Sequence, residues 1–306
     1  MRRFLIIGAS LAAAGCIRIV ELHGDDNDTD AVPVDAPGID ADTSAPCSVP
    51  LACLAPDAGK VSLCGWIHDI ETDAMIAAAS PLRQACAATT ADGPCSLRVR
   101  FFDALDFAMY PTGAVPSAPQ SLTVDDCGRF VAHNLPRAAF GFISIVVDNG
   151  AGTADRYVPT AVPYANAVAS PVRAYATRRT TDAAWTTSAS LGGPSFVERG
   201  VLVMAYVFHG VPHAGVQARR NGANIPGDDF YFGDSMSTRN TVDPARTNTG
   251  PNGSVLVINS ANPIAHDGVG NSPAGCQWPS RLGASPPGVV SVQRFEAETT
   301  AGELCP

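Results

Sequence analysis

The serine with the clearest potential for catalysis is Ser235, which follows Gly233 and Asp234 after the aromatic run Phe230–Phe232. A serine hydroxyl is a poor nucleophile unless a nearby base, most often a histidine, removes its proton. A nucleophilic role for Ser235 therefore requires that the sequence also supplies such a base.

The stretch around Ser235 resembles the first block of GDS-type esterases, in which the serine after Gly-Asp is the nucleophile. The resemblance implies that the base lies in an Asp-x-x-His pair, but none of the six histidines has an aspartate three residues earlier. It also implies α/β layers around the nucleophile, and the segment after Ser235 is too short to form them. The sequence therefore favours a polar loop at Ser235 over an esterase site, and it predicts no catalytic residue.

His209 and His213 have a spacing that can bind a metal, because residues four apart share one face of a helix. However, residues 201–208 alternate like a strand, and Pro212 would break a helix between the two histidines. Zinc would also need a third protein ligand, and nothing in the sequence places His266 beside the pair. We predict a turn with two solvated histidines, and neither a metal site nor a cofactor.

The first residues are typical of a secretory signal peptide. Arg2 and Arg3 precede an apolar run that ends at Ala14, and the small residues Ala14 and Gly15 lead into Cys16. The apolar run is about half of the ~20 residues that a membrane-spanning helix needs.

The sequence Ala13-Ala14-Gly15-Cys16 resembles the lipobox of bacterial lipoproteins, although Ala13 stands where that family usually has leucine. The resemblance implies that residues 1–15 are removed and that Cys16 carries the lipid. Because Ile17 is not the aspartate that retains such lipoproteins at the inner membrane, it also implies an outer-membrane or surface position. The alternative is an ordinary signal peptide with an incidental cysteine.

Residues 16–46 are predicted to form a disordered acidic tether. Eight acidic residues face the single Arg18 there, among several prolines and almost no apolar residues, so little surface can be buried. The tether accounts for −7 of the net charge of −9, and the signal contributes +2, which leaves −4 for the rest. A nearly neutral head without a basic patch excludes nucleic acid as a partner.

Eight cysteines follow Cys16, and an even number in an exported chain indicates disulfides. No CxxC pair supports a zinc site instead. The pairing of the first six stays open, whereas Cys276 and Cys305 are the only two in the C-terminal part, and we expect them to pair. The candidate disulfide cysteines are Cys47, Cys53, Cys64, Cys86, Cys95, Cys127, Cys276 and Cys305.

Alternation of apolar and polar residues predicts an all-β protein. Two short helices are expected, at 74–88 and at 181–190, with Thr181 able to cap the second and Trp185 able to pack. The expected strands are 61–70, 97–101, 129–132 and 140–147 in the first half, and 201–208, 216–219, 254–259 and 289–295 in the second. We predict two tandem antiparallel β-sandwich domains at 47–150 and 195–306, joined by a connector with a short helix at 151–194.

The second domain resembles the carboxypeptidase regulatory-like domain, a transthyretin-type (prealbumin-like) sandwich. The residues that carry the resemblance are Val211–Ala218 and Thr249–Leu256, and the first domain is similar at Gly65–Ile67 and Asp126–Phe130. The resemblance implies a seven-stranded sandwich with an accessory, adhesive or ligand-binding role, and it supplies no catalytic residues.

The aromatic residues offer one alternative function, since exposed rings can form a platform for sugar or peptidoglycan, although aromatic residues of sandwiches are more often core. The rings concerned are Trp66, Trp185, Trp278, Phe101, Phe102, Phe230, Tyr231 and Phe232. The sequence predicts a non-enzymatic lipoprotein of the cell envelope, anchored to a membrane by its N-terminal lipid. An envelope protein or a polysaccharide is the expected partner.

Overall fold

The structure is a computed structural model that describes residue 53 and residues 55–76, 97–109, 122–123, 127–138, 140–148, 157–164 and 171–306. The predicted signal peptide, Cys16, the tether, Cys47, Cys86, Cys95 and most of the predicted helix at 74–88 lie outside the described residues. In the described ranges, none of the helices combines the length and apolar character needed to span a bilayer.

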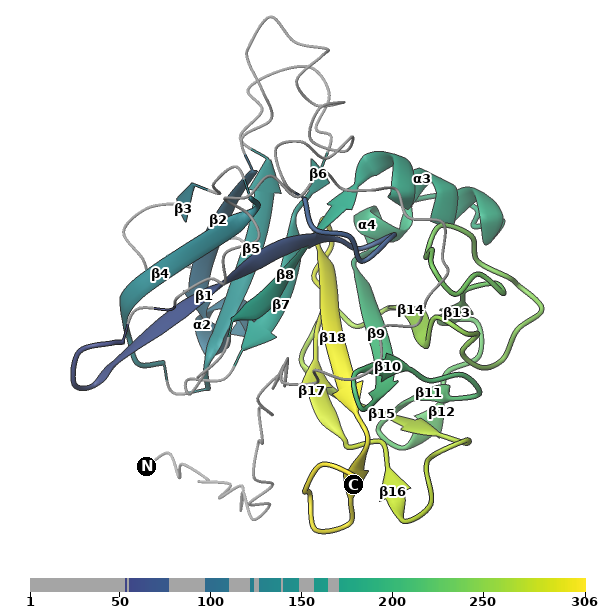
Figure 1. Cartoon of the computed structure of the whole chain (residues 1–306). Helices are drawn as coiled ribbons and strands as arrows, with labels where there is room; N and C mark the ends of the chain where they lie inside the picture. Colours follow the sequence, from purple (N-terminus) through teal and green to yellow (C-terminus); the bar gives the residue numbers. More distant parts are fainter. Residues whose placement is uncertain are drawn as a thin grey trace, which may run out of the picture.

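The first half of the described chain forms a β-sandwich (Figure 1). Its two layers share one apolar core, to which Leu63, Phe101, Phe130 and Phe142 contribute fully buried side chains. One layer has the order β4-β1-β8-β6, with β4 (Arg129–Pro136), β1 (Lys60–Asp69), β8 (Val172–Arg178) and β6 (Tyr157–Val158). The other layer contains β7 (Thr160–Tyr164), β5 (Phe142–Asp148), β2 (Leu97–Asp103) and β3 (Leu122–Thr123), and the short helix α2 (Ala104–Met109) follows β2.

The second half forms another sandwich, with its own core around Met204, Tyr206, Trp278 and Phe295. One layer contains β13 (Asp229–Tyr231), β14 (Ser254–Ile258), β9 (Val201–Phe208) and β18 (Val290–Glu296), with β10 (Val211–Pro212) paired to β9. The facing layer has the order β12 (Ala223–Asn224), β11 (Gln217–Arg220), β15 (Ile264–Val269) and β17 (Arg281–Gly283). A separate pair is formed by β16 (Cys276–Gln277) and β19 (Glu298–Thr299).

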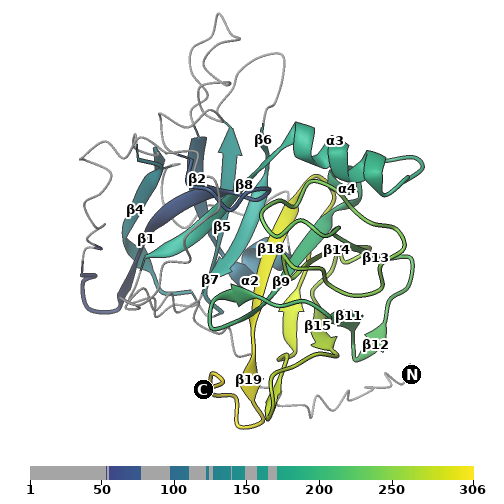
Figure 2. The same cartoon turned by 45° about the vertical axis from the view of Figure 1, so that its right-hand side comes forward.

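One nine-stranded sheet runs through both sandwiches, because β18 lies between β9 of the second and β7 of the first (Figures 1 and 2). Val290 of β18 pairs in parallel with Thr160 of β7 and with Val201 of β9. Successive side chains of a strand point to opposite faces. Val290 and Val292 therefore join the larger core of the first sandwich, while Phe295 joins the core of the second. Backbone hydrogen bonds of this shared sheet therefore join the two sandwiches, in addition to the covalent chain.

Two helices cover the junction between the sandwiches. The helix α3 (Arg179–Ser188) follows β8 directly, and α4 (Phe196–Arg199) leads into β9. Trp185 of α3 and Phe196 of α4 are fully buried in the same core as Val290. Ser195 caps α4, since its side chain accepts a hydrogen bond from the backbone N–H of Glu198, whose carboxylate in turn accepts one from Ser195 N–H.

The all-β sandwich class is confirmed, and most strands predicted from alternation are present. Three pairings between described strands are parallel, namely β1 with β8, β18 with β7 and β18 with β9, which the alternation did not indicate. The range 151–194, expected as a connector, contains β6, β7 and β8, which complete the first sandwich. The capping role expected for Thr181 is wrong, because α3 begins at Arg179 after Arg178, without a side-chain cap.

Gly65 sits where β1 passes between β4 and β8, and it permits an unusually close approach of two backbones. A Cβ atom on Gly65 would lie 1.8 Å from the carbonyl oxygen of Val172 on β8. Only a residue without a side chain fits this position. The parallel pairing of β1 with β8 therefore depends on this glycine.

Candidate functional site

Ser235 lies in the long loop that joins β13 to β14, and it is exposed to solvent. Its hydroxyl oxygen accepts hydrogen bonds from Thr238 N at 3.0 Å and from Thr238 Oγ1 at 2.7 Å. Its carbonyl oxygen accepts one from the Asn252 side chain at 3.2 Å. These contacts are those of a turn that closes on itself. In the described part of the chain, no hydrogen bond joins Ser235 to a histidine.

The contacts seen for the five described histidines are with groups other than Ser235. His68 Nδ1 is 2.8 Å from the carbonyl oxygen of Asp73, and His133 Nδ1 is 2.9 Å from Ser62 Oγ. His266 is fully buried in the second sandwich. Within the described residues, the hydroxyl of Ser235 is hydrogen-bonded to Thr238 and not to a histidine that could act as its base.

His209 lies within the tight turn between β9 and β10, and His213 directly follows β10. His209 and Gly210 both have positive φ, at 50° and 75°, which suits a two-residue hairpin turn. His209 is exposed, but His213 is half-buried, with its ring centroid 5.4 Å from that of Trp278. The expectation that both histidines are solvated is therefore wrong for His213. In the described residues, no group of three or more metal-binding side chains is present.

The aromatic residues that could form a sugar platform are mostly inside the molecule. Trp185 and Phe232 are fully buried and meet edge to face with centroids 6.0 Å apart. Phe230 packs in the same way on Phe196 at 5.0 Å, and Trp278 is buried against Tyr206 at 5.4 Å. Phe101, Phe102 and Tyr231 are buried as well, whereas Trp66 is half-buried. Most of the described rings named in the sequence analysis therefore build the cores, and Trp66 is the one among them that is half-buried without belonging to a core cluster.

The structure reveals a site at the junction of the sandwiches that we call the Arg239 lock, made of Ile70, Glu71, Trp185, Arg239 and Ser254. Arg239 lies in the β13–β14 loop, and its Nη1 donates to the carbonyl oxygen of Ile70 at 3.1 Å. Its backbone N–H donates to Glu71 O at 2.8 Å, and its Nε donates to Ser254 Oγ at 2.9 Å. Trp185 Nε1 donates to the Arg239 carbonyl oxygen. One residue thus ties the end of β1, helix α3 and strand β14 together.

A charged cluster adjoins the lock on the first sandwich. Glu71 accepts hydrogen bonds from Arg178 Nη2 at 2.7 Å and from Thr181 Oγ1 at 2.8 Å, both on one carboxylate oxygen. Asp69 is fully buried, and its Oδ1 lies 3.5 Å from Arg178 Nε. Burial raises the pKa of Asp69, and the neighbouring Arg178 acts in the opposite direction. The ion pairs fix the turn whose carbonyl oxygens Arg239 binds.

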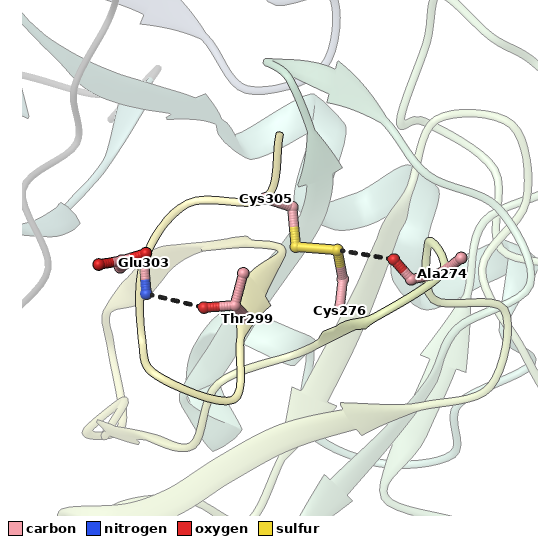
Figure 3. The surroundings of a disulfide bond; sticks show 5 residues. All are labelled: Ala274, Cys276, Thr299, Glu303 and Cys305. Carbon is pink, nitrogen blue, oxygen red and sulfur yellow. Dashed lines mark hydrogen bonds between the residues drawn. A yellow bond between two sulfur atoms is a disulfide. The ribbon is translucent and has the colours of Figure 1, made fainter.

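Disulfide bonds are present in both sandwiches. Cys53 is bonded to Cys64 of β1, and Cys127 is also disulfide-bonded. Cys276 and Cys305, the pair expected from the sequence, are joined across 29 positions, with Cα atoms 6.1 Å apart. Figure 3 shows the yellow sulfur bridge between the strand that carries Cys276 and the C-terminal segment. Disulfides form and persist in oxidising compartments, so they indicate a protein outside the reducing cytoplasm.

The C-terminal segment around the disulfide is folded back on itself. Cys305 N–H donates to Ala297 O at 3.2 Å. Figure 3 shows the second contact, in which Glu303 N–H donates to Thr299 Oγ1 at 3.3 Å. Cys276 Sγ is 3.6 Å from the carbonyl oxygen of Ala274. The disulfide therefore fastens the end of the chain to the strand pair β16–β19.

Comparisons with known proteins give distant structural likeness only. No protein-family model matches the chain, and no curated protein matches its sequence. The shaft pilin SpaA of Lactobacillus rhamnosus GG aligns with 78% of this chain and 98% of its own, at 10% identity and a TM-score of 0.22. A streptococcal ancillary pilin (77% and 68%, 9% identity, TM-score 0.23) and a minor pilin of Streptococcus agalactiae (80% and 99%, 9% identity, TM-score 0.21) also align. At these TM-scores the likeness carries no conclusion about fold or role, and the carboxypeptidase regulatory-like assignment stays a prediction.

Sequence reasoning did not find the Arg239 lock. Arg239 stands in a polar stretch without periodicity, and Ile70 contributes only a backbone oxygen, so no motif marks the contact. The one signal was Trp185, which was expected to pack from a short helix. The burial of Trp185 is therefore the one feature of the Arg239 lock that the sequence predicted.

Proposed function

We propose that this chain is an exported structural or adhesive protein of the cell surface, in which two sandwiches act as one rigid body. The observation that carries the proposal is the nine-stranded sheet in which β18 is paired to both halves. Adhesive and spacer proteins need to keep a fixed shape under load, and a continuous sheet with a half-buried polar lock would provide it. The disulfides agree with an oxidising location.

We further propose that the rigid body is held at a membrane by a lipid on Cys16, behind the acidic tether of residues 16–46. The support is the sequence pattern before Cys16 together with the self-repelling composition of the tether. A lipid anchor followed by an extended segment would hold the sandwiches away from the membrane surface. The outer membrane is the proposed location, because Ile17 follows the cysteine.

Lipidation is tested by the intact mass of the protein from the membrane fraction of cells that express the full chain. We expect a mass that lacks residues 1–15, includes acyl chains and lacks the hydrogens of the oxidised thiols. The matched variant Cys16→Ser should be neither acylated nor retained in the membrane fraction. Full-length protein in the cytosol, with Met1 intact and free thiols, would contradict the proposal.

Rigidity is tested by differential scanning calorimetry and by small-angle X-ray scattering of the wild-type protein. We expect the two sandwiches to unfold in a single cooperative transition and to keep one fixed separation in solution. Two independent transitions, or scattering that requires a range of separations between the sandwiches, would contradict the rigid body.

The esterase and sugar-binding alternatives are tested on the same protein. Turnover of a short acyl ester that Ser235→Ala abolishes would establish the enzyme. A glycan-array or peptidoglycan signal that Trp66→Ala removes would establish the sugar-binding surface, because Trp66 is the tryptophan that is not fully buried. The proposal expects neither signal, and it expects cross-linking on cells to recover a neighbouring envelope protein.

A further inference from the structure

Three basic side chains stand directly opposite one another in the outer layer of the second sandwich. Arg220 of β11 pairs with His266 of β15, and His266 pairs with Arg281 of β17. Side chains that are opposite each other on antiparallel strands point to the same face of the sheet. His266 is 0% exposed and Arg281 is 9% exposed, so this face is the inner one.

Carboxylates occupy both ends of this row. Arg220 Nη1 lies 3.0 Å from Asp228 Oδ2, and its Nη2 donates to the carbonyl oxygen of Ile258 at 2.6 Å. Arg281 Nη2 lies 2.6 Å from Glu298 Oε1, in a pair whose side chains are 8% and 7% exposed. The imidazole of His266 therefore has one ion pair on each side. Arg220 pairs with Asp228 on one side, and Arg281 pairs with Glu298 on the other.

No further carboxylate in the described residues offsets a charge on His266. Asp267 is the adjacent residue on β15, and therefore points to the outer face, where it pairs with Arg219 at 2.8 Å and 3.0 Å. Tyr206 of β9 donates its hydroxyl to the backbone oxygen of Asp267, and burial raises its pKa well above 10, so it stays neutral. The imidazole thus sits between two cations.

The facing sheet brings uncharged groups to Gly283 and His266, and it also carries a titratable carboxylate, Asp229 of β13, whose Oδ2 accepts from the Tyr231 hydroxyl at 2.8 Å beside β11. A Cβ atom on Gly283 of β17 would lie 2.6 Å from Gln293 Oε1, 3.0 Å from Leu202 Cδ2 and 3.2 Å from His266 Cδ2, so all three groups meet at this glycine. Gln293 Nε2 donates to the carbonyl oxygen of Leu282 at 3.0 Å. The edge strand β17 thus has three attachments. It pairs with β15 at His266, it accepts a hydrogen bond from Gln293 of the facing sheet, and its Arg281 binds Glu298 of β19.

We propose that this row is an acid-sensitive latch, in which protonation of His266 places a third positive charge between Arg220 and Arg281 and releases β17 and β19 from the second sandwich. The proposal concerns the integrity of the second sandwich and does not depend on the lipid anchor or on adhesion. Glu298 transmits the release to β19, because it lies on that strand and binds Arg281. The Cys276–Cys305 disulfide keeps the released segment attached.

The direction of the pH effect follows from linkage. Burial, and next the positive charge of Arg220, lower the pKa of His266 to about 4, while the backbone of Arg219 acts the other way. The unfolded state, with a histidine pKa of about 6.5, binds the proton more tightly than the folded state. The stabilisation is therefore complete above about pH 6.5 and is lost as the pH falls toward 4.

The test compares the folding equilibrium of the wild-type protein with that of His266→Gln, by urea titration at pH 7.5 and at pH 5.0. Relative to the variant, the folding constant of the wild type should fall roughly 30-fold between these values. His133→Gln removes an exposed histidine of the first sandwich, and its pH dependence should match that of the wild type. Parallel pH profiles for the wild type and His266→Gln would overturn the proposal.

A second measurement needs no variant, so the proposal stays testable if His266→Gln does not fold. Hydrogen exchange of the wild-type protein, corrected for the intrinsic pH dependence of amide exchange, is compared at pH 7.5 and pH 5.0. We expect protection to fall in peptides that contain β15, β17 and β19, and to persist in β1, β2 and β5. Unchanged protection in β15 and β17, or an equal loss in both sandwiches, would rule out a local latch.

Discussion

Arg239 and Ile70 are 169 positions apart in the chain, and a hydrogen bond of 3.1 Å joins Arg239 Nη1 to the carbonyl oxygen of Ile70. The bond spans the two sandwiches, because Ile70 directly follows β1 and Arg239 belongs to the β13–β14 loop. A charged donor placed on a buried carbonyl oxygen stabilises more than a neutral one. The contact therefore links the folding of one half to that of the other.

We predict that Arg239→Ala lowers the free energy of unfolding by about 2–4 kcal/mol, because Ile70 O and Ser254 Oγ lose their charged donor. The thermal transition should also broaden or separate into two steps as the halves uncouple, which calorimetry measures. The matched control is Arg246→Ala, since Arg246 lies in the same loop and pairs with the exposed Asp234. A loss in Arg246→Ala as large as that in Arg239→Ala would assign the effect to the loop rather than to the lock.

Gly65→Ala should destabilise the first sandwich by about 3 kcal/mol or more, because its Cβ would collide with a backbone oxygen on β8 that has no freedom to move aside. Gly192→Ala is the control, since nothing lies within 4 Å of a Cβ at that position. Urea denaturation of both variants measures the difference. Equal stability of the two variants would mean that β1 and β8 can separate without cost.

The strands that could be predicted are those whose own side chains carry the pattern. Residues 201–208 alternate strongly and form β9, and residues 97–101 form most of β2. The strand β7 was missed because its five residues include Pro163, which lowers strand propensity, although Pro163 pairs with Ile143 within the sheet. Its place next to β18 depends on the pairing of Thr160 with Val290, far away in the sequence, and no local pattern encodes such a partner.

Of the contacts between side chains, the sequence predicted one disulfide but not the surroundings of His266. The pairing of Cys276 with Cys305 followed from counting, because no other cysteines lie in that part of the chain. The burial of His266 between two arginines did not, because it depends on the register of three strands, and a shift of one residue would turn the imidazole to the other face. Residue type limits what a position can do, and strand register decides which positions meet.

The Cys276–Cys305 disulfide should contribute about 3–4 kcal/mol, since the bridge closes a loop of 29 positions and so restricts the unfolded chain. The double variant Cys276→Ser/Cys305→Ser is expected to lose that amount in urea denaturation. Adding reductant to this double variant should not destabilise β16 and β19 any further. If the double variant is as stable as the wild type, the unfolded chain gains no freedom from the loss of the bridge.

The buried Asp69 should give the first sandwich a pH dependence opposite in sign to that of His266. Burial raises the pKa of Asp69, so below neutral pH the folded state holds the proton more tightly than the unfolded state. This contribution to stability is fully present below the unfolded pKa of about 3.9 and is lost as the pH rises through the folded pKa. Asp69→Asn has no such dependence, so its stability relative to the wild type should increase between pH 3 and pH 6, as measured by urea titration. Asp106→Asn, at an exposed position on α2, should keep a constant difference from the wild type over the same range. A constant difference for Asp69→Asn as well would mean that Arg178 offsets the cost of burying the carboxylate.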